Sequence, residues 1–212
     1  MSESILRMLT DVGAVITNDH IVYTSGQHGS TYVNKDAVYP YREKRRVLGW
    51  DLVHPFEDAG VTVIVGPAIG GAILAAAAAD RLGDLKRSPV LSVFAEKQAD
   101  ETFSIKRGYD KLVRGQIVLV VEDVLTTGAS ARGVVEAVRA CGGTVIGVSA
   151  ICNRGRVTAA MLGDVRRLVS LVELHMESWP EEECPLCQQG VPINIELGKG
   201  REFLARKAQQ AT

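Results

Sequence analysis

Residues 117–143 read IVLVVEDVLTTGASARGVVEAVRACGG and contain the pattern that decides the fold. Five apolar residues, 117–121, predict a buried strand, and Glu122 and Asp123 follow at its end. A short polar loop then leads into a helix predicted over 130–141, because apolar residues recur there at helical spacing: Val134, Val135, Val138 and Cys141. The stretch is therefore a strand, a loop and a helix in succession.

The same alternation extends outward in both directions. Short, wholly apolar runs at 61–65, 90–94 and 144–151 predict further strands, and helices are expected near 42–58 and over 71–82. Strands that are apolar on both faces and alternate with helices indicate an α/β fold, with a mostly parallel sheet covered on both sides. Ligands bind such sheets beyond the carboxyl ends of the strands, so function is expected after Val65, Phe94, Val121 and Ile151.

The remaining segments predict appendages on a single domain of residues 1–212. Ile5, Leu6, Leu9 and Val12 keep helical spacing, so an N-terminal helix is expected. A polar stretch after it predicts two short strands around a turn at 25–30. We expect a core over 41–152 and a small hood built from 1–40 and parts of 153–212.

Composition excludes several classes of function. The chain is 46% hydrophobic and 23% charged, which is typical of a globular protein. Lys and Arg number 24 against 25 Asp and Glu, so no basic excess favours nucleic acid as a partner. The longest apolar run, 72–79, is too short to cross a membrane, and no secretion signal is visible at the start of the sequence. With only four cysteines, a cytoplasmic protein is expected.

The loop at 126–130 has the composition of a monophosphate site. Its glycine and hydroxyl groups stand at a predicted helix N-terminus, where backbone N–H groups and the helix dipole attract anions. It is neither a Walker A loop nor a dinucleotide fingerprint. Glu122 and Asp123 would repel a phosphate, so hydroxyl groups or a cation suit them better. A turn with a Ser130 cap is the simpler interpretation, but it does not require two carboxylates, so a sugar phosphate is the preferred ligand.

The run VVEDVLTTGAS resembles the phosphoribosyl pyrophosphate motif of type I phosphoribosyltransferases. This resemblance implies the type I phosphoribosyltransferase fold, with Glu122 and Asp123 on the ribose hydroxyls. It also implies Mg²⁺ held by substrate oxygens with Asp123 assisting, rather than by a protein cage. The 5-phosphate is then bound by the loop that follows: Val124, Leu125, Thr126, Thr127, Gly128, Ala129 and Ser130. In the same family, the loop at Ala68, Ile69, Gly70 and Gly71 binds pyrophosphate through main-chain N–H groups. We expect Gly66, Gly70 and Gly71 to adopt backbone angles closed to other residues.

Two further segments resemble the orotate phosphoribosyltransferases. The first is GPAIGG at 66–71, and the second is TSGQHGSTYVNKD at 24–36, which is similar to their N-terminal segment over the base, although Gln27 replaces an arginine. Orotate is then expected to contact Thr126, Arg154, Lys35 and His28. Arg154 suits the orotate carboxylate because a guanidinium pairs with a carboxylate through two hydrogen bonds.

The segment after the 90–94 strand departs most from that family. It reads FAEKQADETFSIKRGYDKLVRG, in which Lys97 matches a basic residue, but Glu96, Asp100 and Thr102 replace Arg, Lys and His. This pattern resembles a divergent, Thermus-like branch, in which Lys106 and Arg107 are expected to supply the missing charge. The catalytic set is then Glu122, Asp123, Lys97 and Arg107. Residues 97–109 hold few apolar side chains, so this segment is expected to be mobile without ligand.

The resemblance implies transfer of ribose 5-phosphate from phosphoribosyl pyrophosphate to orotate. A homodimer with shared sites is also implied, Lys97 of one subunit reaching the Asp123 site of the other. Two alternatives stay open. One is another base, uracil or a purine, since the phosphate and ribose motifs do not report the base. The other is a regulatory protein that senses phosphoribosyl pyrophosphate, which the lack of basic charge disfavours.

The pair Cys184-Pro-Leu-Cys187 raises the question of zinc. Structural zinc takes four ligands, and only one close pair is visible. His175 is the nearest candidate for a third ligand, and Cys152 for a fourth. A lone C-x-x-C is a weak signal, so a structural turn without metal is the preferred interpretation.

Overall fold

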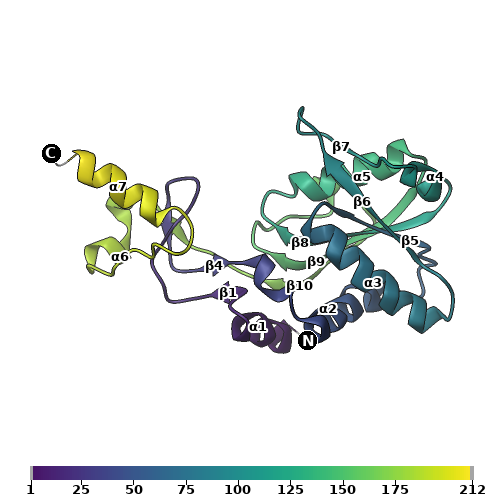
Figure 1. Ribbon diagram of the computed structural model, residues 1–212, viewed down its shortest axis with the longest axis horizontal. Coiled ribbons are helices and arrows are strands. Elements are labelled where there is room, and N and C mark those ends of the chain that lie inside the picture. Colours follow the sequence, from purple (N-terminus) through teal and green to yellow (C-terminus); the bar gives the residue numbers. More distant parts are fainter. Residues whose placement is uncertain (1, 211–212) are drawn as a thin grey trace. The chain divides into compact units, whose positions relative to one another are not determined.

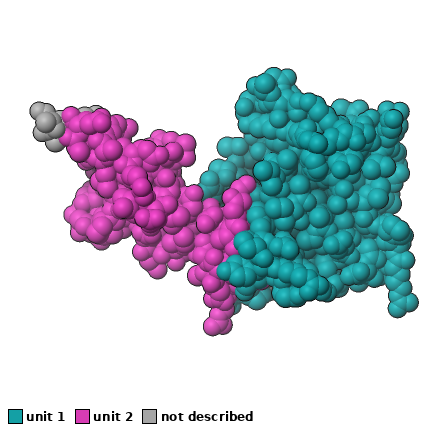
Figure 2. Space-filling model, viewed as in Figure 1, with its two compact units in different colours: residues 1–5, 38–174 teal, residues 6–37, 175–212 magenta. Residues whose placement is uncertain are grey.

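The computed structural model describes residues 2–210 and divides them into two compact units, coloured separately in Figure 2. The first unit holds residues 38–174, together with the start of helix α1 (Ser2–Asp11). The second combines residues 6–37 with the segment from 175 onward. The two units are described separately below.

A six-stranded sheet forms the centre of the first unit, in the order β10-β9-β8-β5-β6-β7 (Figure 1). All neighbouring pairs are parallel except β6 and β7. The strands are β5 (Val63–Pro67), β6 (Leu91–Lys97), β7 (Phe103–Ser104), β8 (Ile117–Leu125), β9 (Thr144–Asn153) and β10 (Leu168–Glu173). The predicted α/β fold with a mostly parallel sheet is confirmed.

Helices cover both faces of this sheet (Figure 1). On one face, Val134, Val135 and Val138 of α5 (Ala129–Ala140) join a buried cluster with Val63 and Val118. Side chains alternate between the faces of a strand, so Ile64 and Leu119, both fully buried, belong to the opposite face. The other helical segments of this unit are α2 (Arg42–Val53), η2 (His54–Phe56), α3 (Gly70–Lys86), α4 (Tyr109–Val113) and η3 (Ala160–Leu162).

The second unit contains short elements. A three-stranded sheet orders β11 (Ser178–Trp179), β3 (His28–Gly29) and β2 (Ile21–Val22), and β1 (Val15–Ile16) pairs with β4 (Tyr32–Val33). The helical segments are η1 (Lys35–Val38), η4 (Glu181–Glu183), α6 (Pro185–Gln188) and α7 (Gly200–Gln210). The predicted hairpin is present, but Tyr23 N–H donates to Gln27 O across its turn, which therefore lies earlier than predicted.

Several elements differ from the sequence predictions. Strand β8 continues through Glu122 and Asp123 to Leu125 instead of ending at Val121. Strand β10 was not predicted, and it keeps residues 168–173 with the central sheet. Helix α3 runs to Lys86, four residues beyond its predicted end. None of the helices that the structure describes has both the length and the apolar character needed to cross a bilayer.

Candidate active site

The carboxyl ends of four parallel strands meet at one edge of the sheet. Ala68 to Gly71 follow β5, Lys97 ends β6, Glu122 and Asp123 lie in the last part of β8, and Arg154 follows β9. Parallel pairing of β6, β5, β8 and β9 places all four ends on the same side. This is the edge at which doubly wound sheets bind ligands.

The acidic pair at the end of β8 is buried. Glu122 is 4% exposed and Asp123 is 3% exposed, and the strand extends past both residues. Asp123 accepts hydrogen bonds from the Tyr39 hydroxyl at 3.0 Å and from the Val124 N–H at 2.7 Å. The Glu122 carboxylate accepts from the Asp123 N–H at 3.0 Å. These bonds hold the Asp123 carboxylate in one orientation.

The loop between β8 and α5 presents donors at a helix start. Thr126, Thr127, Ala129 and Ser130 are exposed, while Gly128 is buried and has a φ of +79°. The first turn of α5 offers backbone N–H groups that have no acceptor within the helix, and α5 is long enough to carry a dipole. The loop can therefore bind an anion of phosphate size.

The loop after β5 approaches the acidic pair closely. A Cβ built on Gly70 would lie 2.3 Å from Asp123 Oδ2 and 2.7 Å from the Tyr39 hydroxyl. Built on Gly66, it would lie 2.2 Å from Gly71 O. None of Gly66, Gly70 and Gly71 has a positive φ, so the expectation of special backbone angles is wrong. Close packing requires these glycines instead. The Ala68–Ile69 peptide bond is cis.

Two of the predicted orotate residues lie side by side. Arg154 Nε donates to Thr126 Oγ1 at 2.9 Å. The backbone supports this contact, because the N–H groups of Arg154 and Gly155 both donate to Leu125 O, at 3.0 and 3.1 Å. Both side chains are at least partly open to solvent. Thr126 belongs to the loop 126–130, called the phosphate loop below, and Arg154 lies beside it. A guanidinium in this position can bind the carboxylate of a base that lies beside a bound ribose phosphate.

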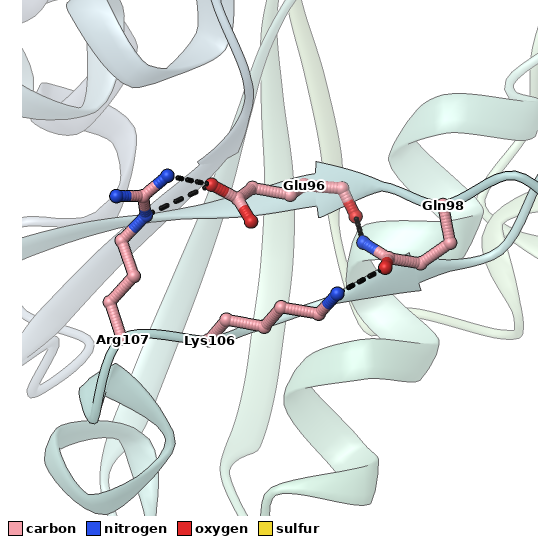
Figure 3. A network of polar contacts seen from close by, with 4 residues as sticks. All are labelled: Glu96, Gln98, Lys106 and Arg107. Carbon is pink, nitrogen blue, oxygen red and sulfur yellow. Dashed lines mark hydrogen bonds and ion pairs between the residues drawn. The ribbon is translucent and has the colours of Figure 1, made fainter.

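A hairpin of β6 and β7 carries the predicted loop cations. Arg107 donates from Nε and Nη2 to Glu96 Oε1, at 3.0 and 2.7 Å, and Lys106 Nζ donates to Gln98 Oε1 (Figure 3). Gln98 Nε2 in turn donates to Glu96 O at 2.7 Å. Lys97, at the end of β6, pairs with Glu101. Each of the two predicted catalytic cations therefore has a carboxylate partner.

Apolar side chains hold part of this hairpin in place. Ile105 is buried, and Phe103 packs against the core cluster under α5. The expectation that too few apolar residues anchor the segment 97–109 is wrong for this part, although the turn at 98–102 is exposed. The anchor was missed because two apolar residues in a polar segment give no periodic signal.

The other two predicted orotate residues belong to the second unit. Lys35 is exposed at the start of η1. His28 is fully buried, and its ring lies beside His20, Cys184 and Cys187. Because its imidazole is enclosed by other side chains of the second unit, His28 is an unsuitable orotate contact.

A basic hollow of about 1110 Å³ lies along α2 and α3, away from the phosphate loop. Five arginines line it, together with Asp80 and Asp84: Arg42, Arg45, Arg46, Arg81 and Arg87. Its lining includes Tyr39 but none of residues 122–130. The chemistry of the strand ends, rather than the size of a hollow, therefore locates the candidate site.

Comparison with known proteins agrees with this arrangement. The family model described as "Phosphoribosyl transferase domain" matches residues 54–186. The chain belongs to the phosphoribosyltransferase family. That match begins before β5 and includes the phosphate loop, the acidic pair and Arg154, so all the strand-end residues of the first unit lie within it.

Individual relatives of this phosphoribosyltransferase are similar over most of its length. The orotate phosphoribosyltransferase of Caldanaerobacter subterraneus is 36% identical over 181 residues, which cover 84% of this chain and 88% of that protein. A crystal structure of Mycobacterium tuberculosis orotate phosphoribosyltransferase with Fe(III) dicitrate has a TM-score of 0.66 at 24% identity and covers 82% of this chain and 96% of that one. The same enzyme in complex with 5-phospho-alpha-D-ribosyl 1-diphosphate has a TM-score of 0.56 at 28% identity, over 68% and 81% of the two chains.

Proposed function

We propose that the protein is an orotate phosphoribosyltransferase, which converts orotate and phosphoribosyl pyrophosphate to orotidine 5-phosphate and pyrophosphate. The observation that carries the proposal is the grouping at the strand ends: Asp123, fixed by Tyr39 and closely approached by Gly70, with the loop 126–130 beside it and Arg154 on Thr126. Relatives at about 35% identity that carry this name support it.

The reaction is a displacement at the anomeric carbon of the ribose. The bond from this carbon to the pyrophosphate oxygen breaks, and pyrophosphate leaves with the bonding electrons. A bond to a ring nitrogen of orotate forms, and the proton of this nitrogen passes to the leaving pyrophosphate or to solvent. The transition state resembles an oxocarbenium ion, so the protein needs to position the reactants and neutralise charge rather than form a covalent intermediate.

Each element of the site has a distinct task in this scheme. The loop 126–130 binds the 5-phosphate, and Glu122 and Asp123 accept hydrogen bonds from the ribose hydroxyls. Residues 68–71 contact the pyrophosphate, and Arg154 with Thr126 orients the orotate carboxylate. Lys97 and Arg107 neutralise the departing pyrophosphate. Lys35 of the second unit remains a proposed orotate contact.

Mg²⁺ is the proposed cofactor, bound mainly by pyrophosphate and ribose oxygens. Asp123 fits an assisting role because it is a carboxylate with a fixed orientation at the ribose end of the site. Bound there, Mg²⁺ supplies positive charge against the pyrophosphate oxygens. The protein's own contribution is to hold Asp123 through Tyr39 and the Val124 N–H.

We also propose a cytoplasmic homodimer with shared sites, in which Lys97 of one subunit serves the Asp123 site of the other. The support is the family pattern, together with the exposed position of Lys97 on its hairpin. Asp123→Asn and Lys97→Ala dimers, each impaired, should regain activity after dissociation and reassociation, since a mixed dimer contains one intact site. No gain in a verified mixed dimer would assign the hairpin to its own subunit.

The function itself is tested by the ultraviolet absorbance of orotate on mixing with phosphoribosyl pyrophosphate and Mg²⁺. Absorbance should change with orotate, and neither uracil nor adenine should be consumed in parallel assays. Asp123→Asn should lower turnover strongly, whereas Tyr39→Phe, which removes a hydrogen bond but keeps the carboxylate, should lower it less. Consumption of uracil or adenine would reassign the base. Binding of phosphoribosyl pyrophosphate without turnover of any base would favour a regulator.

A further inference from the structure

Four potential metal ligands meet in the second unit, far from one another in sequence. They are His20, just before β2, His28 in β3, and Cys184 and Cys187 at the start of α6. One ligand atom from each lies within 4.8 Å of the other three. His175 and Cys152, the candidates that the sequence offered for completing a zinc site, are not members of this group.

The distances fit a tetrahedral ion. Sγ of Cys184 and Sγ of Cys187 each lie 3.6 Å from His20 Nε2, and Cys187 Sγ lies 3.3 Å from His28 Nδ1. The two imidazole nitrogens are 3.0 Å apart. A tetrahedral zinc ion with its usual bond lengths separates sulfur from nitrogen by about 3.6 Å and nitrogen from nitrogen by about 3.3 Å. Only small shifts would bring all four atoms to an ion.

The His20 ring is oriented by a contact outside the cluster. Its Nδ1 lies 2.7 Å from the carbonyl oxygen of Val191, so this nitrogen carries the proton and donates it. Nε2, with its free lone pair, then points at the two sulfurs and at His28. A histidine whose second nitrogen donates to a carbonyl is the usual arrangement around protein-bound zinc. The backbone of His20 is fixed as well, because Asn194 N–H donates to its carbonyl at 2.8 Å.

We propose that His20, His28, Cys184 and Cys187 bind one zinc ion with a structural role. Two thiolates and two neutral imidazoles balance the charge of Zn²⁺ and match its preferred donor set. His20, His28 and Cys184 are buried, so four protein ligands close the site and leave no position for a substrate. The ion would join the β2–β3 hairpin to the C-terminal segment of the same unit, whose strands are only two residues long.

A redox-active pair is the rival interpretation of Cys184 and Cys187. Redox-active pairs are partly exposed, so that an oxidant or a partner thiol can reach the sulfur. Here Cys184 is buried, and both sulfurs lie 3.6 Å from the same imidazole nitrogen, His20 Nε2. A metal ion is thus the better explanation for two imidazoles placed against two thiols.

The experiment measures metal content in the full chain, expressed with zinc in the medium and purified without chelator. Mass spectrometry of the metal should give about one zinc per chain, and Cys187→Ser should lose most of it. Cys141→Ser and His175→Asn are matched controls that keep the zinc, since neither residue belongs to the cluster. Cobalt exchanged into the wild-type chain should show the intense visible bands of tetrahedral coordination with thiolate ligands.

Thermal melting gives a second readout that is independent of orotate turnover. A strong chelator should lower the melting temperature of the wild type but not that of Cys187→Ser. If that variant fails to fold, the zinc stoichiometry and cobalt spectrum of the wild type still decide. The proposal is overturned if the reduced wild-type chain lacks zinc and takes up no cobalt, or if fresh protein contains a Cys184–Cys187 disulfide instead. None of these outcomes bears on the orotate assay, so the two proposals fail separately.

Discussion

Replacing Gly70 by alanine tests whether the pyrophosphate loop and the acidic pair share one rigid site. The new methyl group would lie 2.3 Å from Asp123 Oδ2 and 2.7 Å from the Tyr39 hydroxyl, so the carboxylate has to move. Gly83→Ala is the matched control in the same helix, α3. There the added Cβ would lie 3.4 Å from Ser88 O, which is an ordinary contact.

The expected magnitudes follow from these contacts. Displacing Asp123 weakens its hydrogen bond from Tyr39, and bonds to a charged group contribute about 1.5–3 kcal/mol. In a chain of this size, that loss lowers the melting temperature by about 3–12 °C. A similar loss at the ribose hydroxyls lowers kcat/KM about tenfold to a hundredfold. Gly83→Ala should raise the melting temperature by about 1–4 °C, because alanine is favoured over glycine inside a helix by about 0.5–1 kcal/mol.

The assay combines thermal melting with orotate consumption for both variants at saturating and limiting phosphoribosyl pyrophosphate. The same substitution should therefore lower the melting temperature at Gly70 and raise it at Gly83, although both residues lie in α3. Wild-type kcat/KM and an unchanged melting temperature for Gly70→Ala would refute the close approach of the two loops. Equal damage in both variants would show a general effect on α3 rather than an effect on Asp123.

Three further predictions concern other parts of the first unit. Arg154→Ala should weaken orotate binding tens- to a hundredfold while leaving phosphoribosyl pyrophosphate affinity nearly unchanged, and titration of each ligand separately would expose an equal loss of both. Amide hydrogens at 98–102 should exchange fast without ligand and slower with phosphoribosyl pyrophosphate and Mg²⁺, while Ile105 stays protected throughout; full protection at 98–102 in the free protein would contradict a closing hairpin. Burial raises the pKa of Cys152 from 9.0 to about 12, so the folded state keeps a proton that the unfolded chain loses. The free energy of unfolding should therefore fall as pH rises from about 9 towards 12, and a decline just as steep in Cys152→Ala would assign it to other groups.

The central sheet could be predicted from the sequence because burial on both faces leaves a local signal. The runs at 63–65 and 117–121 are continuously apolar, and their strands lie in the middle of the sheet. Strand β10 was missed although its residues 168–172, LVSLV, are as apolar as the run at 90–94. It lies at the edge of the sheet, and three of its six residues are only partly buried while a fourth is exposed. An apolar run alone does not tell an edge strand from a central one.

The motifs of the candidate site could be predicted from the sequence, but the contacts between residues far apart in the chain could not. The spacing of Glu122, Asp123 and the loop 126–130 is local and specific, so the sequence alone indicated a sugar phosphate. The contact between Tyr39 and Asp123 joins residues 84 positions apart, and the sequence around neither residue predicts it. The Cys/His cluster was missed for the same reason, because His20 and Cys184 lie 164 positions apart. One signal was available, namely two histidines eight positions apart in a predicted hairpin, in a chain that also holds C-x-x-C.

The departures of the hairpin from the family pattern make physical sense once its contacts are known. Glu96, which stands where an arginine is usual, accepts two hydrogen bonds from Arg107, and Glu101 pairs with Lys97. Both pairs are open to solvent, so each stabilises the free protein only weakly. Pyrophosphate carries several negative charges and offers more acceptors than one carboxylate, so it can displace either partner. In the proposed mechanism, the acidic residues therefore hold Lys97 and Arg107 in position at the strand ends and still leave them available to the leaving group.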